Sequence, residues 1–233
     1  KKPTFNKNLE NIIPSDPKQP YDVREIIYAL SDESKFLEVQ ELWAPNIVIG
    51  FGRMDGETVG FVANQPMYLA GVLDCDASDK AARFIRFCDA FHIPLITLVD
   101  TPGFLPGTSQ EHGGIIRHGA KLIFAYAEAT VPKISLILRK AYGGAYIVMS
   151  SKTLGGDENL ALPNAEIAVM GPEAAVKIVY RKVLDQTETG PEGRAAREAE
   201  LVHPYREELA HPFSAASHAY LDDVIHPQEC RRR

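Results

Sequence analysis

Residues 133–146 read KISLILRKAYGGAY and combine a strand signal with a glycine pair. Residues 133–138 are apolar and partly β-branched, which is typical of a buried strand. Gly143 and Gly144 follow, and residues 147–151 could continue as a helix. A strand that passes through a glycine pair into a helix leaves backbone N–H groups free at the helix N-terminus, where they can hold an oxyanion. Such a turn suits chemistry on a thioester or a ureido carbonyl, because both develop negative charge on oxygen.

A second turn of the same kind precedes this one in the chain. Residues 94–99 predict a buried strand that ends at Asp100, and Gly103-Phe104 lies in the loop that follows. Residues 114–129 then predict a helix with one apolar face. A helix that links adjacent parallel strands brings their carboxyl ends to one edge of the sheet, so we expect the two turns to meet there. Taken alone, Gly143-Gly144 is also typical of a tight turn between closely packed backbones.

The other segments complete an α/β chain, because helices alternate with apolar strands. The sequence predicts the following elements: an extended arm over 1–20, helices over 23–30, 77–91 (capped by Asp76 or Ser78) and 172–180, a hairpin of 46–54 with 58–63 around Asp55-Gly56-Glu57, and a strand–turn–strand over 159–169. The polar residues 185–200 predict an exposed excursion from the domain. The residues after 200 predict helices that are interrupted at Pro204, Pro212 and Pro227. Residues 21–233 are expected to form one domain.

Composition narrows the class of function. The chain has 233 residues, 45% of them hydrophobic and 24% charged, with a net charge of -6. This charge argues against nucleic acid as the main partner, since phosphate binding requires a basic surface.

The sequence shows neither a signal peptide nor an apolar run long enough to span a membrane, so no membrane partner is expected. Three cysteines without metal-ligand spacing predict a reducing compartment, the cytoplasm or, in a eukaryote, the mitochondrial matrix. The first residue is Lys1 and not methionine, so we expect a segment of a longer polypeptide or a processed one.

Side-chain candidates for catalysis are weaker than the two turns. His112 and His118 flank the loop, but no Ser or Cys lies in a nucleophile-elbow motif nearby, and Ser109 is better interpreted as a loop hydroxyl or cap. Asp100-Thr-Pro-Gly resembles a GTPase switch loop, but no phosphate loop precedes it. Arg139 and Lys140 could pair locally or meet an anionic substrate, and the sequence leaves both open.

Several long motifs resemble one known family, the biotin-dependent acyl-CoA carboxyltransferases. The matching stretches are NQP at 64–66, ARF at 82–84, FCDAF at 87–91, GFLPG at 103–107, EHGGIIRHGAK at 111–121, AEATVP at 127–132, RKAYGGAY at 139–146 and AEIAVMG at 165–171. The resemblance runs from about residue 21 to the C-terminus. It is to the C-terminal half of the β subunit of a propionyl-CoA or acetyl-CoA carboxylase, and it implies a crotonase-like (ββα spiral) fold.

The resemblance implies transfer of the carboxyl group of carboxybiotin to the α-carbon of a short-chain acyl-CoA. It places the biotin ureido oxygen on the amides of Gly144 and Ala145, with Gly143, Gly103 and Phe104 lining the same pocket. Relatives selective for propionyl-CoA commonly have aspartate at the position of Ile147, so Ile147 is expected to contact the acyl end and alter specificity. No metal is expected.

The resemblance also implies partners. Biotin would arrive on a biotin carboxylase or biotin carrier subunit, because this chain has neither a Met-Lys-Met attachment sequence nor an ATP-grasp loop. The CoA side of the site would come from the N-terminal half of a neighbouring subunit in a homo-oligomer, a hexamer by resemblance. This chain alone is then expected to be inactive.

Three alternatives remain open. The same chemistry serves the carboxyltransferase subunit of a biotin-dependent decarboxylase or transcarboxylase. A crotonase-type hydratase or isomerase shares the oxyanion geometry but needs glutamates at the site, and Glu111 is the only acidic residue beside the glycine loops. A non-enzymatic scaffold half is the third.

Overall fold

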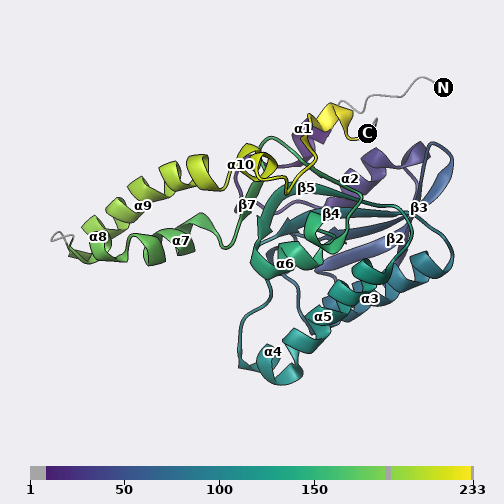
Figure 1. Cartoon of the computed structure of the whole chain (residues 1–233), viewed down its shortest axis with the longest axis horizontal. Coiled ribbons are helices and arrows are strands. Elements are labelled where there is room, and N and C mark those ends of the chain that lie inside the picture. Colours follow the sequence, from purple (N-terminus) through teal and green to yellow (C-terminus); the bar gives the residue numbers. More distant parts are fainter. Residues whose placement is uncertain (1–8, 187–189, 232–233) are drawn as a thin grey trace.

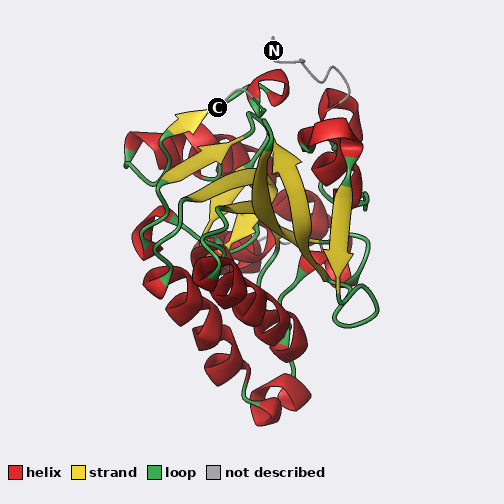
Figure 2. Ribbon diagram, turned by 90° about the vertical axis from the view of Figure 1, so that its right-hand side faces the viewer, coloured by secondary structure: helices red, strands yellow, loops and turns green. Residues whose placement is uncertain are grey.

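The computed structural model describes residues 9–186 and 190–231. One eight-stranded mixed sheet forms its centre, in the order β1-β2-β3-β4-β5-β6-β8, with β7 paired to β5 (Figures 1 and 2). The strands are β1 (Phe36–Val39), β2 (Ile47–Met54), β3 (Glu57–Asn64), β4 (Leu95–Thr101), β5 (Lys133–Tyr142), β6 (Glu158–Ala161), β7 (Glu166–Ala168) and β8 (Asp223–Val224). β1, β2 and β3 pair antiparallel, and all other pairs are parallel. This is the α/β architecture that the sequence predicts, and it brings the carboxyl ends of β3, β4 and β5 to one edge.

Helices cover both faces of the sheet, as Figure 1 shows. One face carries α1 (Leu9–Ile12) and α2 (Val23–Leu30), and the other carries α3 (Cys75–Ala90) and α5 (Ile115–Glu128). Because successive strand residues point to opposite faces, Phe61 joins the core under α2 while its neighbour Val62 joins the core under α3. The central strands are therefore apolar on both faces, as parallel strands between two helical layers must be.

The predicted hairpin and the predicted helices over 23–30, 114–129 and 172–180 are confirmed. Asp55 and Gly56 both have positive φ, +52° and +88°, which is the geometry of a type I′ hairpin turn. Cys88 is buried where α3 packs directly on β3, and a Cβ at Gly60 would lie 2.6 Å from its Sγ. The expected cap of α3 was wrong, because the helix begins two residues earlier and Asp74 accepts a hydrogen bond from the N–H of Ala77 at 2.8 Å.

The other helical segments include elements that the sequence did not predict. Besides α7 (Pro172–Val179), which is the predicted helix over 172–180, they are α4 (Thr108–Gly113), α6 (Gly143–Val148), α8 (Arg181–Asp185), α9 (Gly190–Leu209), α10 (Pro212–Ser217) and the short 3-10 turns Asp32–Ser34, Leu69–Gly71, Lys152–Leu154 and Pro227–Glu229. Among the described residues, no helix is long and apolar enough to cross a bilayer.

Two expectations about irregular segments were wrong. The expected extended arm over 1–20 contains α1, and Leu9 is buried in the core under α2; residues 1–8 lie outside the described part. The expected helix interruption at Pro204 is absent, because α9 runs from Gly190 to Leu209, whereas the described residues of the expected exposed excursion over 185–200 are largely exposed and helical. Val202, two residues before this proline, packs with Val176 and Leu184.

The helices α7, α8 and α9 form a hairpin that projects away from the sheet, on the left of Figure 1. Its own small core contains Val176, Leu184 and Val202, with Tyr180 and Tyr205 packed against them. The hairpin returns to the sheet where the N–H of Ile167 in β7 donates to the carbonyl of Ala210, at 2.8 Å.

A buried lysine joins α3 to the loop before β2. The Nζ of Lys80 donates to the carbonyl oxygens of Trp43, Ala44 and Ile47 at 2.7, 3.2 and 2.8 Å. Burial lowers the pKa of Lys80 from 10.5 to about 8. Ile47 pairs with Asn64 at the end of β3, so this anchor holds the loop at the same edge as the glycine turns.

The lowered pKa of Lys80 predicts a pH dependence of stability. Between about pH 8 and 10.5 the unfolded chain keeps the lysine proton while the folded chain releases it, so the contribution of Lys80 to stability rises with pH in this window. Urea unfolding should show that the stability difference between wild type and Lys80→Met shifts in favour of wild type from pH 8 to 10. The exposed Lys182→Met on α8 is the control, with a flat difference. A flat difference for Lys80→Met as well would contradict this account.

Candidate active site

The two glycine turns meet at the carboxyl edge of the sheet. β4 ends at Thr101 and β5 ends at Tyr142, and these strands pair in parallel. A Cβ built on Gly144 would lie 3.7 Å from a ring carbon of Phe104, so the second turn lies in van der Waals contact with the first. The juxtaposition that the sequence predicts is therefore present, with Phe104 as the point of contact.

The Gly143 turn leads directly into α6. Gly143 has φ +57°, and a Cβ there would lie 2.8 Å from the carbonyl oxygen of Val169, so glycine is required on both counts. Because α6 begins at Gly143, the N–H groups of its first turn have no intrahelical acceptor, and no described side chain caps them. Gly144 is exposed, whereas the side chain of Ala145 is buried. The amide of Gly144 is thus in an exposed residue at a helix N-terminus, where it can donate to an anionic oxygen, and the uncapped amide of Ala145 follows it in a residue that is 0% exposed.

The Gly103 turn is fixed by hydrogen bonds on both sides. The N–H of Leu73 donates to the carbonyl of Gly103 at 3.1 Å, and the N–H of Leu105 donates to the carbonyl of Leu73 at 2.8 Å. The ring of Phe104 packs on Gly119 of α5, where an added Cβ would lie 2.9 Å away. Gly119 therefore leaves the space that lets Phe104 reach Gly144.

Asp100 organises the strand ends beneath the turns. Its side chain is fully buried, and its Oδ2 accepts from Arg139 Nε at 3.0 Å and from the Tyr21 hydroxyl at 2.9 Å. Its Oδ1 accepts from the N–H of Lys140 at 3.1 Å, and its own N–H donates to Asn64 Oδ1 at 3.2 Å. Burial and the Asp100 carboxylate raise the pKa of Tyr21, which keeps this hydroxyl a donor. Asp100 thus connects β4 to β5 and the N-terminal segment through its carboxylate and to β3 through its backbone N–H.

The cations of β5 also hold the segment before α2. Arg139 donates to the carbonyls of Asp16 and Gln19 at 3.0 and 2.8 Å, and Lys140 Nζ donates to the carbonyl of Pro17 at 3.1 Å. Burial lowers the pKa of Lys140. The sequence left open whether Arg139 and Lys140 pair within the protein or meet an anionic substrate. In the structure both side chains bond to groups of the protein itself. These cations hold protein groups.

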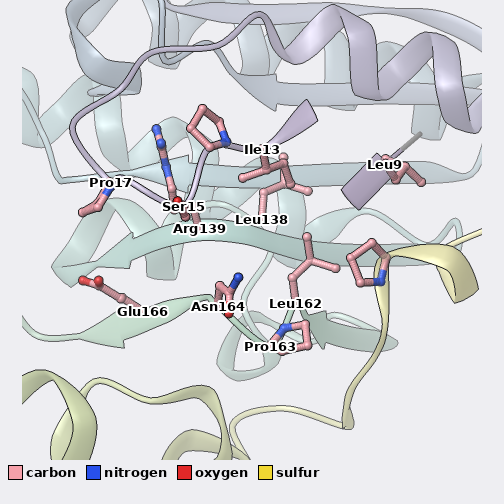
Figure 3. A pocket seen from close by; sticks show the side chains of 12 residues that line it. Leu9, Ile13, Ser15, Pro17, Leu138, Arg139, Leu162, Pro163, Asn164 and Glu166 are labelled. Carbon is pink, nitrogen blue, oxygen red and sulfur yellow. The ribbon is translucent and has the colours of Figure 1, made fainter. Parts of the chain in front are cut away.

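A small hollow lies beside this segment, between Ile13, Pro17, Leu138 and Leu162 (Figure 3). Arg139 and Glu166 also line it, but no residue of the two glycine turns does. The hollow is therefore separate from the candidate site.

The other side-chain candidates lie elsewhere or are already paired. His118 Nδ1 lies 2.8 Å from Asp79 Oδ1, and Lys121 Nζ lies 2.7 Å from the same oxygen. Glu111 and His112 are exposed on α4. Within residues 9–186 and 190–231, no group of three or more His, Cys, Asp or Glu residues is arranged to hold a metal ion.

Ile147 lies on the same helix as the free amides. It is three residues after Gly144 on α6, so both share a face of the helix. Its side chain is 43% exposed. A ligand held by the Gly144 amide can therefore reach the Ile147 side chain.

Sequence reasoning missed three polar residues behind the turn. Tyr142 donates a hydrogen bond to Glu166, and Arg206 Nε lies 2.9 Å from Glu166 Oε1. The sequence signal that could have pointed to Glu166 was an acidic residue inside the apolar stretch that forms β7. Tyr142 and Arg206, the partners of Glu166, are distant from it in sequence, so the sequence could not identify them.

Comparison with known proteins identifies the family. The chain matches the family described as "Carboxyl transferase domain" over residues 1–233 and therefore belongs to it. It is 58% identical over 225 residues to a propionyl-CoA carboxylase carboxyltransferase subunit of Haloferax mediterranei, covering 97% of this chain and 43% of that protein. It is 55% identical over 225 residues to the mitochondrial propionyl-CoA carboxylase beta chain of Sus scrofa, covering 97% of this chain and 40% of that protein.

Solved structures agree with this assignment. Transcarboxylase 12S, with methylmalonyl-coenzyme A bound, superposes with a TM-score of 0.92 at 49% identity and covers 98% of this chain and 43% of that chain. The geranyl-CoA carboxylase beta subunit of P. aeruginosa superposes with a TM-score of 0.85 at 32% identity, covering 98% and 43%. The predicted crotonase-like fold is confirmed, and the chain spans less than half the length of these relatives.

The buried Asp100–Arg139 pair predicts a large stability effect. Asp100→Asn leaves the Arg139 charge buried without its counter-ion, which should lower the free energy of unfolding by about 3–5 kcal/mol. Urea denaturation measures this change. Glu128→Gln, which removes the exposed ion pair of Glu128 with Arg86 at 3.9 Å, is the control and should cost about 0–1 kcal/mol. Equal losses in the two variants would show that the Asp100 network is not a structural anchor.

Proposed function

We propose that this chain forms the biotin side of a carboxyltransferase active site, with the amides of Gly144 and Ala145 as donors to the biotin ureido oxygen. The observation that carries the proposal is the uncapped first turn of α6, placed against Phe104 at the edge where β4 and β5 end. The family match and the biotin-dependent relatives support it, among them the acetyl-/propionyl-coenzyme A carboxylase beta5 subunit of Mycobacterium leprae at 56% identity.

The residues present fit a ureido group. Two free amides on one helical turn can donate to a single oxygen, and the ring of Phe104 offers an apolar wall beside them. When bound, carboxybiotin would supply the carboxyl group as CO2, and the ureido nitrogen that CO2 leaves would take up the α-proton of the acyl-CoA. The amides of Gly144 and Ala145 stabilise the negative charge that develops on the ureido oxygen. The Asp100 network keeps the two turns in register, so these donors are in place before the reaction begins.

The substrate of the proposed reaction is a short-chain acyl-CoA. Relatives at 54–58% identity are named for propionyl-CoA, and two of them for acetyl- and propionyl-coenzyme A. The aliphatic Ile147 beside the free amides suits an acyl end of this size. The 49% identity to transcarboxylase 12S favours one alternative, in which biotin takes a carboxyl group from a donor at one site and passes it to an acceptor at another.

The proposal includes a second protein half. This chain spans 40–44% of the curated relatives, and we infer that the CoA side of the site comes from the N-terminal half on a neighbouring subunit. The exposed apolar side chains of Ile147 on α6 and Phe213 on α10 suit such a contact. Biotin is carried by a separate carboxylase or carrier subunit. The hexamer described for transcarboxylase 12S supports a hexameric assembly here.

Two substitutions at Gly144 isolate the backbone donor. Gly144→Pro deletes its N–H without breaking a helical hydrogen bond, because first-turn amides have no intrahelical acceptor. Gly144→Ala keeps the N–H, and its Cβ makes only ordinary contact with Phe104. With the complementary half and a carboxylated biotin carrier present, kcat for acyl-CoA carboxylation should fall about 10²–10³-fold in Gly144→Pro relative to Gly144→Ala. Equal activities of the two variants would refute the proposed role of this amide, and carboxylation by the isolated chain would refute the half-site.

Ile147 tests the acyl end of the site. We expect Ile147→Asp to lower the ratio of kcat/KM for acetyl-CoA to that for propionyl-CoA, by about tenfold if the side chain lines the acyl pocket. Competition assays on the reconstituted complex measure this ratio. Ile178→Asp, at an isoleucine on α7 that is also exposed, is the control and should leave the ratio unchanged. An unchanged ratio in Ile147→Asp would remove Ile147 from the substrate pocket.

A further inference from the structure

A chain of three polar side chains connects the projecting hairpin to the Gly143 turn. Tyr142 is the last residue of β5 and the N-cap residue of α6, and its hydroxyl donates to Glu166 Oε2. The other oxygen of Glu166 lies 2.9 Å from Arg206 Nε, and Arg206 is in α9. Polar contacts thus run from the base of the hairpin to the residue that precedes the proposed biotin-binding amides.

This chain of contacts is buried at the end that faces the turn. Tyr142 and Glu166 are 6% and 8% exposed, whereas the outer partner of Arg206, Glu173, is exposed. Burial and the Glu166 carboxylate raise the pKa of Tyr142, so its hydroxyl remains a donor at any physiological pH. A buried carboxylate needs its compensating partners, and here Tyr142 and Arg206 supply them from opposite sides.

The segment after β7 also forms the wall behind the turn. β7 pairs with the end of β5, with Glu166 opposite Lys140 and Ala168 opposite Tyr142. The carbonyl of Val169 lies against Gly143, and a Cβ on Gly171 would lie 3.3 Å from the Tyr142 ring. A shift of Glu166 would therefore move both the side chain of Tyr142 and the backbone on which Gly143 rests.

We propose that Glu166, held by Arg206, is a positioning residue that fixes the biotin-side turn through Tyr142. The inference rests on the proposed function, because the donors it orients are the amides of Gly144 and Ala145. It assigns the base of the α7–α9 hairpin a second role beyond its own packing. The hairpin sets the orientation of α6, although α9 itself supplies no group to the reaction.

The test uses Tyr142→Phe and Glu166→Gln in the complex of this chain with its complementary half and a biotin carrier. Tyr142→Phe removes one hydroxyl and keeps the ring, and Glu166→Gln keeps the volume and removes the charge that Arg206 faces. Glu173→Gln is the matched control, since it removes the exposed partner of Arg206 at 3.3 Å and leaves Glu166 in place. Loss of a hydrogen bond to a charged group corresponds to about a tenfold effect or more.

In the kinetic readout, both variants should raise KM for the biotinyl carrier about tenfold, or lower kcat by as much, while KM for acyl-CoA stays within about twofold. Glu173→Gln should behave as wild type. Arg206→Lys should restore part of the loss seen in Arg206→Met, because it returns a cation to Glu166. Parallel changes in both KM values, or equal effects of Glu173→Gln and Glu166→Gln, would overturn the inference.

Hydrogen exchange separates this inference from the proposed function. In the same complexes, the peptide that contains residues 143–148 should exchange faster in Tyr142→Phe and Glu166→Gln than in Glu173→Gln. Unchanged exchange would overturn the positioning role even if Gly144→Pro is inactive. Faster exchange, combined with equal activity of Gly144→Pro and Gly144→Ala, would support the structural link and refute the oxyanion role.

Discussion

The buried ion pair between Asp100 and Arg139 is the constraint on which the candidate site depends. Their side chains are 0% and 5% exposed, and they join β4 to β5 where the register between these strands shifts. A buried charge without its partner costs several kcal/mol, so the two strand ends cannot separate without a large penalty. The turns at Gly103 and Gly143 begin within a few residues of this pair. The ion pair therefore helps to fix where the two turns lie. The remaining bonds of Asp100, to Tyr21 and to the amide of Lys140, extend the same constraint to the segment before α2.

The site that results offers backbone donors in place of a titratable acid or base. His118 is engaged with Asp79 and Lys121, and the acidic Glu111 lies exposed on α4. Donors fixed by helix geometry suit a reaction in which the cofactor handles the proton and the protein stabilises charge on oxygen. An edge that presents one set of donors to solvent also fits a half-site that another protein half completes.

Local signals in the sequence were enough for much of the fold. Asp55-Gly56 predicted the hairpin, apolar periodicity predicted α2 and α5, and the βαβ rule placed Gly103 beside Gly143. The errors came from contacts between distant residues. β5 extends past Leu138 to Tyr142 because Asp100 and β7 pair with its last residues, and α9 continues through Pro204, close to where Val202 packs on α7. Arg139 bonds Asp16 across 123 residues, a contact that no local pattern can indicate.

The most direct measurement is a crystal structure of this chain assembled with its complementary half and soaked with biotin. We predict that the ureido oxygen lies about 2.7–3.1 Å from the backbone nitrogens of both Gly144 and Ala145, with the ring of Phe104 against the bound molecule. Biotin bound with that oxygen held by other groups, and with neither amide donating to it, would contradict the assignment of this turn as the oxyanion site.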